Sequence, residues 1–359
     1  MNNYAIVLAA GKGTRMKSLD VSKSKVSYEV LEKPIVRYVL DALKPLNFNK
    51  IITVVGFGGE VTKSLVEDSS DIVWQLEQKG TGHAVMQAAP ILEGKEGYTV
   101  VCCGDTPVVI KDTFKALFDK HINDHNALTL LTAILDNPKG YGRIKRNADG
   151  SQVEAIVEQA DCDEAMDKVK EVNAGIYVFD NVELFKHLHN LKTNNKQGEY
   201  YLTDLLYMFR QEGLKVGASI LANPSEMSGV NNRVQLSEAS AFIQARINKE
   251  LMLNGVTIID PKTTYIGPDV TIGPDTIIYP NTHIYGTTSI GHSSIIGPNS
   301  YIKNAKIGNK CNIISSFVNK NFGGIYFSQN SKSCCATSVT EPIILFDKVF
   351  VKGRHNTGM

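Results

Sequence analysis

The sequence predicts two folds in succession, an α/β domain on a mostly parallel sheet and then a short parallel β-helix. Three observations carry this prediction. Strand-like apolar runs alternate with helical patterns over the first hundred residues, which favours a parallel sheet covered on both faces. A helical pattern without Gly or Pro then runs from Arg233 to Leu253. Beyond it, isoleucine recurs every six residues from Ile266 onward, as in a parallel β-helix.

The first element is an apolar strand that ends in two Ala and two Gly, the stretch Ala5–Gly13. Lys12 and Arg15 follow in the same loop, so backbone N–H groups and cations could hold a polyphosphate there. The loop is not a dinucleotide fingerprint, because Met16 stands where the third Gly would fall, and it is not a P-loop. The alternative is a tight turn with basic residues for solubility.

The next elements alternate between helix and strand. Pro34 could begin a helix that continues with Ile35 and Val36 at helical spacing. Further strands are expected at 51–55, 71–75 and 99–103, and helices at 60–67 and 82–89 with Thr81 as N-cap. Ligands of parallel sheets bind beyond the carboxyl ends of the strands. We therefore expect the Gly-rich loop, the segment Gln75–Thr81 and Gly104–Asp105 to meet in one crevice.

The middle of the chain is less regular. The pattern predicts strands at 128–135, 153–158, 172–179 and 215–221, with another fed by the turn Gly140–Ile144, and a helix at 201–211. We expect a first domain over 1–232, a connecting helix over 233–254, a β-helix over 255–318 and a tail of unknown structure over 319–359.

The six-residue period defines the second fold. Each triangular coil takes about three hexapeptides, so the isoleucines fill the interior of about three coils. The step from Ile302 to Ile307 is shortened, and the other steps are six residues long. The series is Ile266, Ile272, Ile278, Ile284, Ile290, Ile296, Ile302, Ile307 and Ile313.

Composition excludes several classes of protein. The chain has 359 residues, 43% of them hydrophobic, and a formal net charge of +1, so no overall field favours nucleic acid or membrane as a partner. Six cysteines without metal-ligand spacing suit a reducing compartment. The sequence shows neither a signal-peptide pattern nor an apolar run of about 18–20 residues, and we expect a cytoplasmic protein.

Eight segments in order resemble sugar-phosphate nucleotidyltransferases. They are most similar to the bacterial bifunctional family with N-acetylglucosamine-1-phosphate uridyltransferase and glucosamine-1-phosphate acetyltransferase activities. The segments are Leu8–Met16, Gln75–Ala84, Gly104–Pro107, Gly140–Ile144, Ile156–Glu158, Asn173–Tyr177, Gln197–Asp204 and Gly229–Arg233. The resemblance implies a Rossmann-like nucleotidyltransferase domain followed by a left-handed β-helix, and synthesis of UDP-N-acetylglucosamine for cell-envelope precursors.

Carried over residue by residue, the resemblance also implies the binding site. Contacts to uridine and ribose would come from Leu8, Ala10 and Gly11, and contacts to the uracil edge from Gln75, Gly80 and Thr81. Arg15 and Lys25 would neutralise the triphosphate as catalytic cations. The sugar would be held by Gly142, Glu158 and Asn173. Asp105 and Asn231 would bind Mg²⁺, the implied cofactor, with Asp105 also counted as catalytic.

Each assignment has a structural alternative. Asp105 could cap a turn, Asn231 could cap the following helix, and Glu158 could be a solvated strand-end charge. His83 is expected to pack or cap rather than catalyse. The attacking sugar phosphate is already an anion, so the reaction needs charge neutralisation and alignment rather than a general base.

The chain departs from the family pattern at three places. Ser24 replaces the usual Pro before Lys25 in a loop about three residues longer, which makes Lys23 a rival for the phosphates. Cys103 stands where an aromatic residue is common. The sequence stops short of the later coils that carry the acetyltransferase site, so we predict no acetyltransferase activity; a truncated product stays open.

Two other functions stay open at this point. One is the same chemistry on another substrate pair, such as glucose 1-phosphate with UTP or dTTP. The other is a non-catalytic subunit or nucleotide-sugar sensor. Because parallel β-helices of this kind often form trimers, we expect a homotrimer.

Overall fold

The computed structural model describes residues 2–20, 22–319 and 324–327. The chain divides into two compact units, and the first comprises Met1–Val30 and Pro34–Ala239. The second comprises Leu31–Lys33 and the chain from Ser240 onward. The division falls inside helix α9, Arg233–Leu253, a helix that has the predicted bounds. Within the described ranges, every helix is too short or too polar to cross a membrane.

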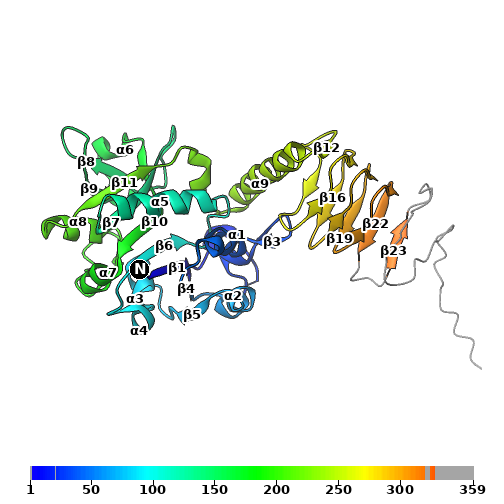
Figure 1. Cartoon of the computed structure of the whole chain (residues 1–359). Coiled ribbons are helices and arrows are strands. Elements are labelled where there is room, and N and C mark those ends of the chain that lie inside the picture. Colours follow the sequence, from blue (N-terminus) through cyan, green and yellow to red (C-terminus); the bar gives the residue numbers. More distant parts are fainter. Residues whose placement is uncertain (1, 21, 320–323, 328–359) are drawn as a thin grey trace, which may run out of the picture. The chain divides into compact units, whose positions relative to one another are not determined.

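A nine-stranded mixed sheet forms the centre of the first unit (Figure 1). Its main path runs in the order β11-β7-β10-β6-β1-β4-β5, and β8 and β9 extend it beside β10. β1 is parallel to both β4 and β6, whereas β10 is antiparallel to β6 and β7. The strands are β1 Asn3–Ala9, β4 Lys50–Val55, β5 Asp71–Trp74, β6 Tyr98–Cys103, β7 Leu128–Ile134, β8 Arg143–Arg146, β9 Val153–Val157, β10 Glu171–Asp180 and β11 Val216–Ile220. The predicted α/β fold with a mostly parallel sheet is confirmed.

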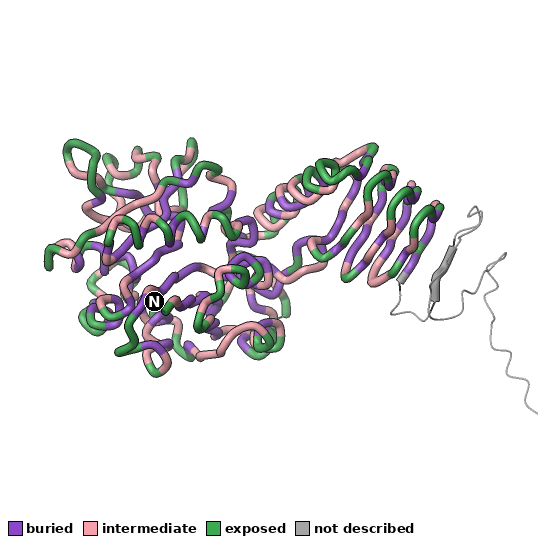
Figure 2. The backbone as a smooth tube through the Cα atoms, in the orientation of Figure 1, coloured by how far each residue is buried: buried purple, intermediate pink, exposed green. Residues whose placement is uncertain are grey.

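Helices cover both faces of this sheet, and the residues of its strands alternate between two apolar cores. Buried residues gather on the central strands, whereas the helices around them carry the exposed residues (Figure 2). In β1, Tyr4 and Ile6 belong to one core and Ala5 and Val7 to the other. The first core is closed by α3 Thr81–Met86, α4 Ala89–Leu92, α7 Asn181–Leu188 and α8 Asp204–Gln211. The second is closed by α1 Ile35–Leu43, α2 Gly59–Val66 and α5 Lys111–Asn123.

The carboxyl ends of the central strands meet at one edge, as predicted. The Gly104 N–H donates to the carbonyl of Leu8 at 2.9 Å, which ties the end of β6 to the end of β1. On the other side, a Cβ on Gly56 would lie 2.8 Å from the Cβ of Ala10, so the turn after β4 requires glycine. The loops that follow β1, β5 and β6 line one crevice.

The second unit is a parallel β-helix of three sheets. Isoleucines pair with isoleucines one coil away, as in Ile266 with Ile284 and Ile278 with Ile296, and these four side chains are buried. The shortened step is accommodated where Ile290 pairs with Ile307. The strands are β12 Thr257–Ile258, β13 Tyr265–Ile266, β14 Thr271–Ile272, β15 Ile277–Ile278, β16 His283–Tyr285, β17 Ser289–Ile290, β18 Ile295–Ile296, β19 Tyr301–Lys303, β20 Lys306–Ile307, β21 Asn312–Ile313 and β22 Ser316–Asn319. The predicted solenoid is confirmed.

Short elements complete the chain. β2 Glu29–Val30 and β3 Lys33–Pro34 form a two-stranded sheet, and α6 covers Glu164–Asp167. The 3₁₀ turns are η1 Thr14–Met16, η2 Lys25–Ser27, η3 Lys44–Leu46, η4 Gln159–Asp161 and η5 Pro224–Met227. Most of the predicted tail lies outside the described residues, apart from Asn319 and β23 Gly324–Phe327, which pairs antiparallel with β22.

Three predicted helix starts need correction, the first being the helix expected at 201–211, which begins only at Asp204. Thr81 is not the N-cap of α3 but its first residue, and Gly80 precedes it with φ of 103°. The Thr81 hydroxyl accepts a hydrogen bond from the Leu202 N–H at 3.1 Å instead of capping its own helix. Pro34 likewise stands before α1, because its extended ψ of 140° excludes it from the helix.

Candidate active site

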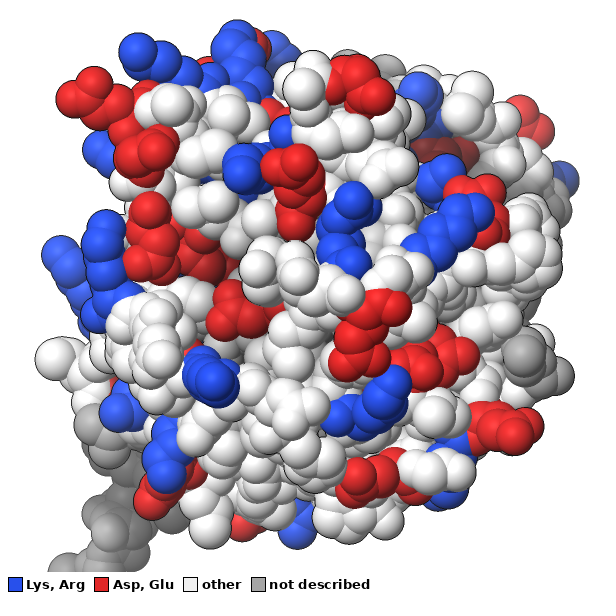
Figure 3. Space-filling model, turned by 90° about the vertical axis from the view of Figure 1, so that its left-hand side faces the viewer, with Lys and Arg blue, Asp and Glu red and all other residues white. Residues whose placement is uncertain are grey.

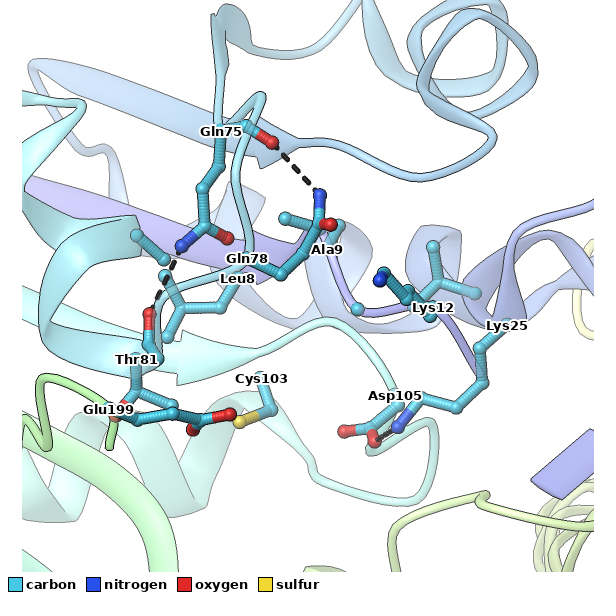
Figure 4. Close-up of a pocket in the computed structure, with 15 residues that line it drawn as sticks. Leu8, Ala9, Lys12, Lys25, Gln75, Gln78, Thr81, Cys103, Asp105 and Glu199 are labelled. Atoms are coloured by element: carbon cyan, nitrogen blue, oxygen red, sulfur yellow. Dashed lines mark hydrogen bonds and ion pairs between the residues drawn. The ribbon is translucent and has the colours of Figure 1, made fainter. Parts of the chain in front are cut away.

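A cavity of about 450 Å³ opens at the shared strand edge (Figure 4). It is lined by the ends of β1, β5 and β6, by the Gly-rich loop and by the start of α3. Eight of the predicted site residues line it, namely Leu8, Ala10, Gly11, Lys25, Gln75, Gly80, Thr81 and Asp105. The crevice expected from the strand ends is thus a real cavity.

The Gly-rich loop turns sharply over Lys25. Gly13 has φ of 60°, and a Cβ there would lie 2.6 Å from the Cβ of Lys25. Only glycine suits both the left-handed backbone and this close approach. The loop then enters η1, which carries Arg15. Its packing against Lys25 brings two cations of the sequence pattern to one end of the cavity.

Gln75 is fixed at the other end of the cavity. Its side chain is buried, and its amide nitrogen lies 3.1 Å from the Gly80 carbonyl and 3.1 Å from His83 Nδ1. Since a carbonyl oxygen only accepts hydrogen bonds, the amide nitrogen must face Gly80. Neither bond uses the side-chain oxygen of Gln75, which can accept a hydrogen bond from a ligand. His83 therefore orients Gln75, in keeping with its predicted packing role.

Lys25 lies between two oxygen-bearing side chains. Its ammonium contacts the Asp105 carboxylate and donates to Asn231 Oδ1 at 3.1 Å. Arg15 donates to the same Asn231 oxygen at 2.9 Å, so four predicted residues form one charged group. The Asp105 carbonyl accepts the Val230 N–H at 2.8 Å, which holds the two chain segments together.

The oxygens of Asp105 and Asn231 suit a hard divalent cation. Both oxygens contact the Lys25 ammonium, so they already face one cation. A carboxylate oxygen and an amide oxygen are ligands that Mg²⁺ accepts. The side chain that caps α9 is that of Asn232, which accepts the Gln235 N–H at 2.9 Å. The side chain of Asn231 is therefore not the helix cap considered in the sequence analysis. The residues present therefore fit a magnesium site.

Lys23 is placed differently from Lys25. Its ammonium lies 4.4 Å from the centre of the Tyr28 ring, a cation–π contact. Lys23 does not line the cavity, whereas Lys25 does. The geometry thus favours Lys25 for the phosphates.

The three predicted sugar residues form a second cluster. The Asn173 N–H donates to the Gly142 carbonyl at 2.9 Å, and a Cβ on Gly142 would lie 3.4 Å from Glu158 Oε2. Glu158 accepts a hydrogen bond from the Thr203 hydroxyl at 3.0 Å. Burial raises the pKa of the Glu158 carboxyl above its ordinary value, so it is not a solvated surface charge. None of the three lines the main cavity.

Sequence reasoning gave no role to several residues at the site. Glu199 and Gln78 line the cavity, and Thr203 holds Glu158. Lys12, one of the loop cations expected to hold a polyphosphate, also lines it. Glu199 and Thr203 belong to the segment Gln197–Asp204, which the sequence pattern had already singled out. Cys103 also lines the cavity, and burial raises the pKa of its thiol to about 12, so it is a neutral group there.

Charges elsewhere on the surface are mixed. Acidic and basic side chains are interspersed over the face that Figure 3 shows, as the net charge of +1 suggests. Lys12 and Lys25 line the cavity, and Arg15 donates to Asn231 beside Lys25, but neither Arg15 nor Asn231 lines the cavity itself.

Comparisons with known proteins agree with this geometry. Residues 4–221 match the nucleotidyl transferase family. The bifunctional protein GlmU of Geobacillus sp. (strain WCH70) is 49% identical over 309 residues, which covers 86% of this chain and 66% of that protein. GlmU of Streptococcus suis (strain 98HAH33) is 49% identical over 75% of this chain and 58% of its own length. GlmU of Streptococcus pyogenes serotype M3 is 47% identical over 99% of this chain and 77% of its own length.

The chain therefore spans less than two thirds of the first two of these relatives. Among solved structures, a protein of Bacillus anthracis assigned as a glucose-1-phosphate thymidylyltransferase, crystallised with sucrose, matches with a TM-score of 0.54. That match covers 67% of this chain and 94% of the other at 20% identity, and it shows the fold alone.

Proposed function

The chain belongs to the nucleotidyl transferase family and, within it, to the GlmU proteins, and from this premise we propose that it makes UDP-N-acetylglucosamine and pyrophosphate from UTP and N-acetylglucosamine 1-phosphate. The observation that carries the proposal is the group in which Lys25 contacts Asp105 and Asn231 while Arg15 contacts Asn231. A cavity with cations and a metal-type oxygen pair at one end suits a triphosphate.

The base end of the cavity supports a uracil nucleotide. The amide nitrogen of Gln75 is engaged by Gly80 and His83, which leaves its oxygen as the polar group for a ligand. That oxygen accepts from the N3–H of uracil or thymine, whereas cytosine offers only a lone pair at N3. Leu8, Ala10 and Gly11 would contact the uridine and ribose, and Gly80 and Thr81 would complete the uracil contacts.

Arg15 and Lys25 would hold the triphosphate and neutralise it. An oxygen of the sugar phosphate attacks the α-phosphorus, a new P–O bond forms, and the bond to the β-phosphate breaks to release pyrophosphate. The attacking oxygen is already an anion, so no proton needs to be removed first. The two side chains contribute by drawing two anions together and by balancing the charge that moves to the leaving group.

Asp105 and Asn231 would hold Mg²⁺. Bound there, the ion would neutralise phosphate charge alongside Arg15 and Lys25. Since the ammonium of Lys25 contacts both ligand oxygens, Lys25 would have to turn from them toward the phosphates when the ion binds.

The sugar would lie against Gly142, Glu158 and Asn173. A carboxylate and an amide at this cluster can bond to hydroxyls and to an N-acetyl group. The absence of a side chain at Gly142 leaves space beside Glu158, since a Cβ there would lie 3.4 Å from its carboxylate.

One experiment distinguishes the proposed function from two alternatives, another sugar nucleotide as product and a non-catalytic sensor. The purified chain is mixed with Mg²⁺ and either UTP, dTTP or CTP, and nucleotide binding and pyrophosphate release are both measured. We expect release with UTP and N-acetylglucosamine 1-phosphate. Preference for dTTP would support another sugar nucleotide as product, and tight UTP binding without release would support a non-catalytic sensor.

The remaining expectations belong to the same proposal. We place the reaction in the cytoplasm and expect a homotrimer formed through the β-helix, which a monomeric mass in light scattering would contradict. The predicted lack of acetyltransferase activity is tested separately, by release of free coenzyme A from acetyl-coenzyme A with glucosamine 1-phosphate.

A further inference from the structure

A buried histidine outside the active site faces two carboxylates. His187 lies on α7 one turn after Glu183, and Glu212 lies at the end of α8. Ligand atoms of these three residues lie within 4.8 Å of one another. Among the residues that the structure describes, no other group of His, Cys, Asp and Glu side chains lies close enough together to hold a metal ion.

The hydrogen bonds of His187 determine which ring nitrogen has the lone pair. The side chain is 1% exposed and packs on Phe209, with the ring centroids 4.7 Å apart. Nδ1 lies 2.8 Å from the backbone carbonyl of Glu183, and because that oxygen only accepts, Nδ1 carries the proton. In the neutral ring, Nε2 therefore presents its lone pair.

This nitrogen has no hydrogen-bond partner within the described residues and lies beside a carboxylate. Nε2 is buried and lies 3.1 Å from Glu212 Oε1, without hydrogen-bond geometry. A nitrogen lone pair and a carboxylate oxygen at this distance repel each other unless a cation lies between them.

The contact between His187 and Glu212 matches part of a metal ligand set, and the Glu183 carboxylate lies 3.5 Å from Nδ1 of the same ring. Metal-binding histidines commonly donate their other N–H to a backbone carbonyl, as Nδ1 of His187 does here. Zinc binds imidazole nitrogen and carboxylate oxygen at about 2.0–2.2 Å in a tetrahedron, which puts neighbouring ligands roughly 3.3 Å apart. The distance of 3.1 Å between Nε2 and Oε1 is close to that value.

We propose that Glu183, His187 and Glu212 form a binding site for a zinc-type divalent cation that joins α7 to α8. The imidazole ligand favours zinc over magnesium, which prefers oxygen ligands alone. The ammonium of Lys186 lies 3.2 Å from Glu183 and 3.1 Å from Glu212, and it is the group that the metal displaces. Lys186 is half-exposed and can turn into solvent.

The test is a titration of the full, chelator-stripped chain with ZnCl₂ in saturating MgCl₂, which occupies the proposed active-site metal position. We expect His187→Gln and Glu212→Gln to weaken zinc binding at least about tenfold. Lys186→Met should strengthen it, because the competing charge is removed. His189→Gln is the matched control, since His189 lies at the end of α7 but is exposed and contacts Glu93 at 2.8 Å.

Thermal unfolding supplies a second readout. Zinc should raise the midpoint by several degrees in the wild type and in His189→Gln, but not in His187→Gln. If His187→Gln does not fold, the exposed position Glu212 carries the test alone. Equal zinc affinity in all variants, or no zinc binding by the wild type, would overturn the site.

Discussion

The Lys25 ammonium lies against the carboxylate of Asp105, and these two residues are separated by 80 positions in the sequence. Both side chains are largely buried, so their attraction is little screened by water. The pair keeps two opposite charges at the end of the cavity in the absence of substrate. In the proposed reaction they separate, Asp105 toward Mg²⁺ and Lys25 toward the triphosphate.

Asp105→Ala should abolish turnover while the fold is retained. Removal of a metal ligand in a phosphoryl-transfer site is expected to lower kcat by about 10³-fold or more. The measurement is pyrophosphate release in saturating Mg²⁺, with circular dichroism as the check on folding. Asp71→Ala is the matched control, because Asp71 forms an exposed pair with Lys50. Near-normal activity of Asp105→Ala would show that the metal assignment is wrong.

Lys25→Met and Lys23→Met should differ in their effect. Loss of the Lys25 charge from the cavity should lower kcat/KM for UTP by on the order of 100-fold. Loss of Lys23, which stacks on Tyr28, should change it by less than about threefold, as expected for a residue outside the cavity. A larger loss in Lys23→Met than in Lys25→Met would reverse the assignment of the phosphate-binding lysine.

Gln75→Ala should weaken the binding of UTP but not the binding of the sugar phosphate. Without the amide, the base loses an acceptor that Gly80 and His83 hold in position, and we expect KM for UTP to rise by about tenfold. Gln87→Ala removes the other side chain near His83 and serves as control. Steady-state kinetics with each substrate varied in turn would make the comparison, and an effect confined to the sugar phosphate would refute the base contact.

Glu158→Gln should raise KM for N-acetylglucosamine 1-phosphate by about tenfold with a smaller change in kcat. Because burial raises the pKa of Glu158, its carboxylate form is lost at a higher pH than that of an ordinary Glu as the solution is acidified. The wild-type KM should therefore rise as pH falls, and that of Glu158→Gln should not. Glu154→Gln, on the strand β9 that precedes Glu158 but paired with Lys145, is the control. Parallel pH profiles in wild type and Glu158→Gln would count against a sugar contact.

His121 should make folding stability depend on pH. Burial lowers the pKa of its imidazole to about 4 from an ordinary value of 6.5, and the ring packs edge-on against Tyr98. The unfolded chain binds this proton more readily, so the contribution to stability is complete above pH 6.5 and is lost as pH falls toward 4. A shift of this size corresponds to about 3 kcal/mol.

Urea unfolding across that pH range gives the measurement. His121→Met should be less stable than the wild type at neutral pH but should lose less stability on acidification. His125→Gln, at a more exposed position just beyond the same helix, controls for the general effect of removing a histidine. An unchanged pH slope in His121→Met would contradict the assignment of the buried neutral ring.

The periodic parts of the fold could be predicted from the sequence because their residues repeat a physical constraint. Each isoleucine from Ile266 to Ile313 fills the same narrow interior, so a fixed spacing is required. The strand ends near Gly11, Gln75 and Asp105 could be placed together since parallel strands have a common direction. Helix α7 was missed, although Asp180 caps it by accepting the Glu183 N–H at 3.0 Å.

Contacts between distant segments could not be predicted from pattern. Nothing near Thr81 in the sequence indicates that its hydroxyl accepts the N–H of Leu202, 121 residues away. The same holds for Thr203, whose partner Glu158 is 45 residues earlier. The choice between Lys23 and Lys25 also needed the structure, because Tyr28 draws one lysine away from the cavity and Asp105 holds the other inside it.

Pyrophosphate release with UTP and Mg²⁺, compared between N-acetylglucosamine 1-phosphate and glucose 1-phosphate, tests the central claim most directly. The proposed function predicts rapid release with the N-acetyl sugar and a strong preference for it over glucose 1-phosphate. Preference for glucose 1-phosphate would contradict the sugar assignment to Gly142, Glu158 and Asn173. Release with neither sugar would contradict the enzymatic function itself.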